Sequence, residues 1–383
     1  MGTQPTYDVA VVGAGVFGVW TAYWLGQSGK RVLLLDGYGP GNSRSSSGDE
    51  SRVIRVGYGA DEIYTRSALR SLQLWRELCS RTGERLLHQT GVLWLAQKED
   101  PYANLTLETL KKLGIATELT AREISAAYPQ FSEAEIGGAF LEAESGVLIA
   151  RRAVQAVARE ALKAGVTYQQ SQITLDKAPQ KFDAIATTDG GRISAGAYVF
   201  ACGAWLPKIF PDLLADRIHP TRQDVFYFGA PPGNRFRPPA LPTWIDFKNE
   251  AYGLPDIEGR GVKVAIDRHG PPFDPDTSDR IASRESLAEV RRYLKRRLPE
   301  LANAPVNETR VCQYENTSNG DFLIDRHPEF DHVWLVGGGS GHGFKHGPFV
   351  GQYVAARIEG LEEGVEPRFS LATKSTEKRR AVF

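Results

Sequence analysis

The sequence is poor in cysteine, carries no excess charge of either sign and lacks any long apolar segment. Its 383 residues include three cysteines, which are too few for a disulfide framework and suit a reducing compartment. The 46 basic residues balance the 46 acidic ones, so the composition does not favour nucleic acid or an anionic membrane surface as a partner. No apolar run is long enough to span a membrane, and the first residues lack the charged start of a signal peptide. We therefore expect a cytoplasmic protein.

Residues 7–36 contain a nucleotide-binding pattern of strand, turn, helix and strand. The apolar run at 9–12 is typical of a strand buried on both faces. It is followed by three glycines in G-x-G-x-x-G spacing: Gly13, Gly15 and Gly18. These glycines allow a tight turn, a close backbone approach to a pyrophosphate and close packing of helix on strand. The second strand, 32–35, ends at Asp36, whose carboxylate can accept a hydrogen bond from a ribose hydroxyl. The pattern predicts a dinucleotide site.

The surroundings of this pattern favour FAD over a nicotinamide cofactor. The glycines lie close to the N-terminus, where FAD places its ADP half in the first βαβ unit. We find no second G-x-G-x-x-G with a strand and an acidic residue of its own, which a separate NAD site would need.

Two arginines end the polar loop that follows Asp36. The loop, 37–51, leaves the tip of a predicted strand, where open α/β sheets bind ligands. Arg52 and Arg55 follow it, and the planar guanidinium group is well suited to carboxylates and phosphates. Two interpretations remain open here: arginines that face an anionic ligand, or solvated arginines of a surface loop.

Two later residues have an ordinary interpretation when only spacing is considered. In the predicted strand 261–266, alternation places Lys263 on one face with Gly261 and Ala265, which favours an outward lysine. In the predicted strand 310–314, Cys312 and Tyr314 share a face, and a strand cysteine is usually an inert buried residue.

The remaining pattern predicts an α/β protein of one large or two ordinary domains. We predict helices at 61–82, within 103–128, and at 151–165, 286–298 and 347–359. We also predict a pair of strands within 136–149 and a hairpin with its turn at 189–191. A strand at 333–336 runs into a glycine cluster, which lets backbone lie against a ligand.

Specific motifs between residues 7 and about 360 carry a resemblance to a known family. They are VVGAGVFG, SGDESRVIR, ALRSLQLW, ESGVL, ACGAW, GVKVAIDRHGPPFDPDT, VCQYENT, DFLIDRHP and SGHGFK. Together they resemble the glutathione-reductase-like flavoenzymes of the D-amino-acid oxidase group. Within that group the chain is most similar to the monomeric sarcosine oxidases, N-methyltryptophan oxidases and pipecolate oxidases.

The resemblance implies two domains, each made of separated stretches of chain. A Rossmann-like FAD-binding domain of the glutathione-reductase type would comprise 1–85, 150–217 and 320–383. A substrate domain with a mixed sheet would comprise 86–149 and 218–319 and would cover the flavin.

The resemblance also implies how FAD is held. Cys312 would be bonded through its sulfur to the flavin 8α carbon, Arg52 would lie against the flavin ring, and Lys263 would promote oxygen reduction. The other expected cofactor-binding residues are Gly13, Gly15, Gly18, Asp36, Ser45, Gly203, Trp205, Gly338, Gly341, Gly343 and Lys345. No metal is expected.

For the substrate, the resemblance implies a carboxylate held between Arg55 and Lys345, in a pocket lined by Tyr252 and Tyr314. Tyr314 joins Arg52 and Lys263 as an expected catalytic residue. The chain departs from the sarcosine oxidases elsewhere: Asp267 stands in place of a histidine, and Trp244 stands at or near a pocket methionine. A sequence usually read CMYT is CQYE here. The residues expected to bind the carboxylate are present, so we expect the same class of reaction. The residues of the pocket walls differ, so the identity of the amine stays open.

We therefore expect a monomeric FAD enzyme that oxidises a secondary amine to an imine and reduces O2 to H2O2. One alternative is a flavin dehydrogenase that passes electrons to a quinone or a carrier protein. Another is a non-catalytic FAD-containing subunit.

Overall fold

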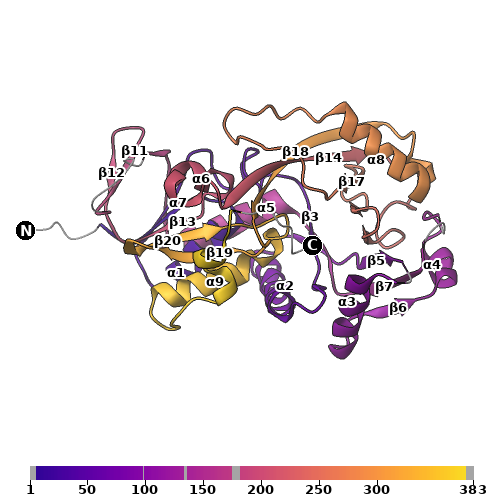
Figure 1. The fold of residues 1–383 in the computed structure, drawn as a ribbon, viewed down its shortest axis with the longest axis horizontal. Helices are drawn as coiled ribbons and strands as arrows, with labels where there is room; N and C mark the ends of the chain where they lie inside the picture. Colours follow the sequence, from indigo (N-terminus) through magenta and orange to yellow (C-terminus); the bar gives the residue numbers. More distant parts are fainter. Residues whose placement is uncertain (1–5, 98, 133–135, 175–181, 377–383) are drawn as a thin grey trace, which may run out of the picture.

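The computed structural model describes residues 6–97, 99–132, 136–174 and 182–376. Residues 1–5, which belong to the stretch considered for a signal peptide, lie outside this range. Figure 1 shows two large sheets side by side, the first with α1 and α9 beneath it and the second with α8 over one end. Among the described residues, no helix has the length and apolar character needed to cross a membrane.

The first sheet has six strands in the order β19-β20-β13-β1-β2-β9. They are β1 (Tyr7–Val12), β2 (Val32–Asp36), β9 (Thr167–Gln170), β13 (Ala195–Phe200), β19 (Leu323–His327) and β20 (Phe330–Gly337). The central strand β1 is parallel to both β2 and β13, and its apolar run is buried, as a strand covered on both faces requires.

Four helices pack around this sheet: α1 (Val16–Gln27), α2 (Glu62–Thr82), α5 (Ala150–Lys163) and α9 (Gly347–Ile358). Helix α1 is buried along nearly all of its length. A Cβ atom at Gly351 would lie 2.5 Å from the backbone of Trp20, so glycine is what allows α9 to approach α1. All four lie where the sequence pattern predicts a helix.

The second large sheet has eight strands in the order β18-β14-β17-β16-β15-β5-β7-β6. They are β5 (Val92–Ala96), β6 (Thr117–Leu119), β7 (Gly138–Glu142), β14 (Ile218–Phe228), β15 (Thr243–Asp246), β16 (Ala251–Leu254), β17 (Val262–Ile266) and β18 (Val306–Thr317). The helices of this region are α3 (Pro101–Lys112), α4 (Ala121–Ala127) and α8 (Arg284–Arg297). Helix α8 buries Val290, Tyr293 and Leu294 in the core of this sheet.

Smaller elements complete the fold. Strands β3 (Arg52–Ile54), β4 (Leu87–His88) and β8 (Gly146–Leu148) form one small sheet, and β10 (Ile173–Thr174), β11 (Ile185–Thr187) and β12 (Arg192–Ile193) form another. Two short helices, α6 (Leu206–Ile209) and α7 (Pro211–Leu214), follow β13. The antiparallel pairing of β11 with β12 confirms the predicted hairpin.

The predicted strand pair within 136–149 is wrong as a pair. Strand β7 pairs with β5 and β6, whereas β8 pairs with β3 and β4 in a different sheet. A Cβ atom at Gly146 would lie 2.1 Å from the carbonyl oxygen of His88, so β8 can approach β4 only because that residue is glycine. The two strands are neighbours in sequence, and this proximity does not determine their partners.

The strands of the two large sheets fall on opposite sides of the predicted domain boundaries. Every strand of the six-stranded sheet lies within 1–85, 150–217 or 320–383, and every strand of the eight-stranded sheet lies within 86–149 or 218–319. The division into an FAD-binding and a substrate domain remains our proposal.

Candidate active site

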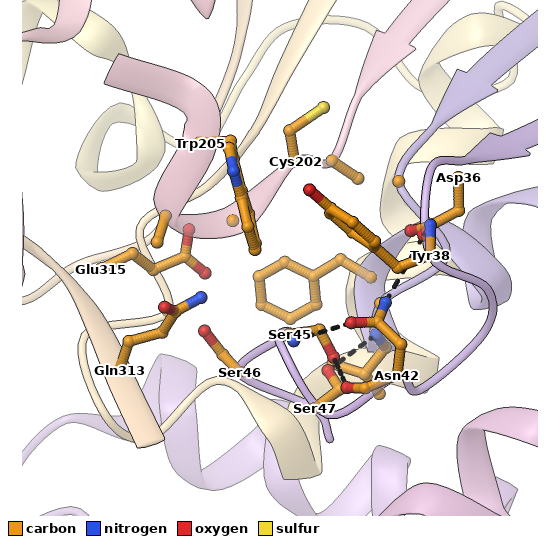
Figure 2. Close-up of a pocket in the computed structure, with 18 of the residues that line it drawn as sticks. Asp36, Tyr38, Asn42, Ser45, Ser46, Ser47, Cys202, Trp205, Gln313 and Glu315 are labelled. Atoms are coloured by element: carbon orange, nitrogen blue, oxygen red, sulfur yellow. Dashed lines mark hydrogen bonds between the residues drawn. The ribbon is translucent and has the colours of Figure 1, made fainter. Parts of the chain in front are cut away.

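A cavity of about 280 Å³ extends from the ends of β1 and β2 to the middle of β18. Figure 2 shows Asp36, Tyr38 and Asn42 along one side of this cavity and Gln313 and Glu315 along the opposite side. Many predicted cofactor-binding residues line it: Gly13, Gly15, Asp36, Ser45, Arg52, Gly203, Trp205, Cys312, Gly341 and Gly343. Gly18, Gly338 and Lys345 do not.

The turn after β1 is shaped by its glycines. Gly13 has a positive φ of 103°, and a Cβ atom there would lie 2.4 Å from the carbonyl oxygen of Ala201. A Cβ atom at Gly18 would lie 1.8 Å from the carbonyl oxygen of Gly13, so this residue serves helix packing and not contact with a ligand. The backbone N–H of Val16 donates to Ser47 Oγ at 3.1 Å, which joins the start of α1 to the polar loop.

Asp36 occupies the far end of the cavity, at the end of β2. Its carboxylate accepts hydrogen bonds from the backbone N–H groups of Ala14, Tyr38 and Gly39 at 2.7–2.8 Å. Burial raises the pKa of Asp36, and these three donors act against that rise. The position and the fixed orientation suit a hydrogen bond from a ribose hydroxyl.

Arg52 and Cys312 meet at the other end of the cavity. The side chain of Arg52 is 16% exposed, which excludes a solvated loop arginine. Its Nη2 lies 3.1 Å from Cys312 Sγ and donates to the carbonyl oxygen of Ser46 at 2.7 Å. Its Nη1 lies 2.5 Å from Asp49 Oδ2. The cysteine sulfur is therefore held next to the positive charge of Arg52, which is largely shielded from solvent.

Lys263 is also buried, so the interpretation as an outward lysine is wrong. Its side chain is 1% exposed, and Nζ lies 2.5 Å from Asp49 Oδ2 and 2.6 Å from the carbonyl oxygen of Ser51. Burial lowers the pKa of Lys263, and the negative charge of Asp49 offsets part of that effect. Lys263 lines neither the cofactor cavity nor the smaller cavity described next, but a third cavity of about 200 Å³ that it shares with Ser51 and Tyr227.

A smaller cavity of about 110 Å³ adjoins the first, because Arg52, Cys312, Tyr314, Gly341 and Phe344 line both. Its other walls include four of the predicted substrate-binding residues: Arg55, Tyr252, Asp267 and Lys345. Residues that are far apart in the sequence therefore meet next to Cys312.

Arg55 and Lys345 place two buried cations in this smaller cavity. Lys345 Nζ donates to Tyr58 Oη at 2.7 Å and to the carbonyl oxygen of His342 at 2.9 Å. The guanidinium carbon of Arg55 lies 4.3 Å from the centre of the Tyr58 ring. Burial, together with the positive charge of Arg55, holds the pKa of Lys345 well below its usual range. An anion bound here would relieve this repulsion.

Tyr314 and Asp267 form a polar pair on another wall. The Tyr314 hydroxyl donates to Asp267 Oδ1 at 2.8 Å. Burial and the Asp267 charge raise the pKa of Tyr314 well above its usual value, so this side chain stays neutral. Tyr314 can therefore accept a hydrogen bond from a substrate while it donates to Asp267.

The placement of Trp244 corrects the sequence prediction. Its side chain is fully buried, its Nε1 donates to Tyr293 Oη at 2.9 Å, and its ring packs edge-on against Phe131. Ile245 lines the smaller cavity in its place. Because successive strand side chains point to opposite faces, a shift of one residue along β15 separates wall from core.

Two buried carboxylates at this site, Asp49 and Glu315, were not singled out from the sequence. Asp49 lies in the motif SGDESRVIR and pairs with both Arg52 and Lys263. Glu315 lies in the mostly buried second half of β18, and it lines the larger cavity. Its neighbours in the sequence are mostly polar, so no local pattern marks Glu315 as a buried site residue.

Comparison with known proteins identifies the family of this chain. Residues 8–357 match the family FAD dependent oxidoreductase (DAO). The chain is 32% identical over 368 residues to monomeric sarcosine oxidase of Arthrobacter sp. (strain TE1826), with 92% of each protein covered. It is 28% identical over 376 residues to N-methyl-L-tryptophan oxidase of Yersinia pestis (strain Pestoides F), with 96% of this chain and 99% of that protein covered.

The fold has a solved counterpart in L-proline dehydrogenase from P. horikoshii, with a TM-score of 0.82 at 24% identity over 96% of this chain and 98% of that one. The chain belongs to the FAD dependent oxidoreductase (DAO) family, and it is a flavoenzyme with FAD as its cofactor.

The residues present fit this cofactor. The glycine turn before α1 leaves room for a pyrophosphate, and Asp36 closes one end of the cavity. Two buried oxygen atoms on its wall, Ser46 Oγ and Glu315 Oε2, have no hydrogen-bond partner within the described protein. A polar ligand in the cavity would supply partners for such atoms.

Proposed function

We propose that this enzyme oxidises a secondary amino acid, which is N-methylated, cyclic or otherwise N-substituted, to an imine, with O2 reduced to H2O2. The observation that carries the proposal is the pair of buried cations, Arg55 and Lys345, in a cavity that adjoins the cofactor cavity at Cys312. Two cations on one wall are suited to a carboxylate. The names sarcosine oxidase and N-methyl-L-tryptophan oxidase also point to N-methyl amino acids as the substrates of those relatives.

FAD supplies the acceptor for the hydride equivalent removed from the carbon next to the nitrogen. The protein's part is to bind and orient the substrate. Arg55 and Lys345 hold the carboxylate at one end, while Tyr252 and Tyr314 limit the position of the amine. The substrate binds as the free amine, so removal of a proton from nitrogen by a protein base is not required.

We further propose that Cys312 carries the flavin through a covalent bond and that Lys263 promotes reduction of O2. Support for the first comes from Cys312 Sγ, which lies at the junction of the two cavities, 3.1 Å from a guanidinium nitrogen of Arg52. The proposal that Lys263 promotes reduction of O2 is supported by its buried positive charge, which Asp49 holds in place. Lys263 is a different residue from the pair that we propose binds the carboxylate. We also propose that the enzyme is a monomer, as the name of the monomeric sarcosine oxidase from Arthrobacter sp. states for that relative.

The test is incubation of the purified holoenzyme in air with a panel of N-methyl, cyclic and glycated amino acids. We expect at least one of them to cause O2 uptake with equimolar H2O2. If the flavin is reduced but O2 uptake is slow, and addition of a quinone restores rapid turnover, the enzyme is a dehydrogenase. If no amine reduces the flavin at all, the protein is not a catalyst of this class.

A further inference from the structure

The carboxyl group of Glu315 faces the cofactor cavity without an ionic partner. The residue is 8% exposed, and it lies on β18 three positions after Cys312. It makes no ion pair with any residue that the structure describes, and its Oε2 atom has no hydrogen-bond partner there. Figure 2 shows the carboxyl group between Trp205 and Gln313, directed into the cavity. Such a group would be costly to bury unless a ligand completes its hydrogen bonds.

Glycine residues surround the carboxyl group of Glu315, and larger side chains would crowd it at two of these positions. Cβ atoms added at Gly337 and Gly339 would lie 3.1 Å from its carboxylate oxygens, and one at Gly203 would lie 3.7 Å away. Three glycines from two turns thus make room for the carboxyl group beside the backbone. The N–H groups of Gly338 and Gly339 are directed at it and act to lower its pKa. Burial has the larger effect and raises the pKa of Glu315 to about 7.

Other titratable groups around the cavity do not provide a counter-charge at Glu315. The charged and titratable side chains that line it with Glu315 are Asp36, Tyr38, Arg52, Cys202, Asp276, Cys312 and Tyr314. Arg52 is engaged by Asp49, and burial raises the pKa of the Cys202 thiol so that it stays neutral. A bound FAD adds the negative charges of its pyrophosphate to this cavity. Those charges favour the protonated form of a nearby carboxyl group still further.

We propose that Glu315 is a further cofactor-binding residue, which binds FAD as a neutral carboxylic acid and donates its proton in a hydrogen bond to an oxygen atom of the cofactor. Binding of FAD at alkaline pH then takes up a proton from solvent. The sign follows from linkage: FAD favours the protonated protein, so its dissociation constant rises with pH once Glu315 ionises in the free protein. This inference concerns the cofactor and does not depend on which amine is oxidised.

The experiment measures FAD binding to apoprotein of the Cys312→Ala variant, in which no covalent bond can form, from pH 6 to pH 9. The dissociation constant should rise by about tenfold per pH unit above pH 7, until the pKa of the bound state is reached. Adding Glu315→Gln, which keeps the size and a hydrogen-bond donor but cannot ionise, should leave binding at pH 6 within a few-fold and remove that rise. Adding Glu308→Gln, at a half-buried position of the same strand that does not line the cavity, should leave the rise unchanged. The same pH profile with and without Glu315→Gln would overturn the proposal.

A second measurement uses the holoenzyme and does not require the apoprotein to fold. At pH 8 the infrared spectrum of the wild type should contain the carbonyl band of a protonated carboxyl group that is missing from Glu315→Gln holoenzyme. If the difference spectrum shows an ionised carboxylate instead, Glu315 accepts hydrogen bonds and the proposal is wrong. Neither readout involves amine oxidation, so failure here would leave the proposed reaction unaffected.

Discussion

The ammonium nitrogen of Lys263 lies 2.5 Å from Asp49 Oδ2, and both side chains are at most 3% exposed. The same oxygen of Asp49 lies 2.5 Å from Arg52 Nη1, and Tyr227 donates to its other oxygen at 3.0 Å. Burial alone would raise the pKa of Asp49, but the two cations outweigh it and hold the pKa well below its usual range. The carboxylate of Asp49 pairs with two cations, Arg52 and Lys263. This cluster therefore has a net positive charge next to the cofactor cavity.

Replacing Lys263 by methionine removes this surplus charge. The first electron transferred to O2 creates superoxide, and a cation about 5 Å away would stabilise it by roughly 3 kcal/mol at an effective dielectric near 20. Reoxidation of the reduced enzyme should therefore slow by about two orders of magnitude. Stopped-flow mixing of substrate-reduced Lys263→Met with O2 measures this step separately from anaerobic reduction. Loss of the reduction step with normal reoxidation would assign Lys263 to substrate binding.

Replacing Asp49 by asparagine should also slow reoxidation, but less than Lys263→Met does, because Arg52 then remains as an unpaired cation. Without its partner, the buried lysine loses the interaction that offsets burial, so its pKa falls further and its positive charge is less stable. Breaking a buried pair also destabilises the fold by about 3–5 kcal/mol, which denaturant unfolding can measure. We expect Asp49→Asn and Lys263→Met to slow reoxidation non-additively when combined. Additive effects would show that Asp49 does not act through Lys263.

A covalent bond at Cys312 predicts that acid-precipitated, washed protein stays yellow. Cys312→Ala should give a white pellet, because its FAD is then held only by hydrogen bonds and packing. Cys202 also lines the cofactor cavity, so Cys202→Ala is the matched control and should stay yellow. A yellow pellet from Cys312→Ala, or a white one from the wild type, contradicts the assignment.

Binding of a carboxylate to Arg55 and Lys345 should weaken as pH rises. The anion binds the protonated lysine, and burial together with Arg55 lowers the pKa of Lys345, so the dissociation constant should increase at a lower pH than for an exposed lysine. Each charge-assisted contact is worth about 1.5–3 kcal/mol, so Arg55→Met or Lys345→Met should raise the constant roughly ten- to hundred-fold.

Titration of the flavin spectrum with a small carboxylic acid measures this binding. Lys111→Met, which removes an exposed lysine paired with Glu118, serves as the control and should bind the acid normally. An unchanged constant in both site variants would exclude the pair as the anion site.

Local patterns in the sequence were enough to predict the nucleotide-binding part of the site. The strand, the turn at Gly13 and the acid at Asp36 lie within one short segment, and each is determined by its immediate neighbours. Helices with strong apolar periodicity, such as α2 and α5, were predicted nearly to their ends.

Long-range contacts could not be predicted in the same way. Lys263 looks like an outward residue by alternation, and it is buried because Asp49 arrives from a loop 214 positions away in sequence. The prediction for Trp244 was wrong by one residue along β15. Ile245 faces the smaller cavity, whereas Trp244 points to the opposite face and contacts Tyr293. Glu315 became notable only when the structure placed it on the cavity wall.

The central claim, that a secondary amino acid is held by its carboxylate for oxidation, is tested most directly by anaerobic titration of the flavin absorbance. The substrate found in the aerobic panel is compared with the same amine lacking its carboxyl group, in the wild type and in Lys345→Met. We predict stoichiometric bleaching by the amino acid in the wild type, much weaker reduction by the decarboxylated amine, and little further loss for that amine in the variant. Equal or faster reduction by the decarboxylated amine in the wild type would contradict the claim.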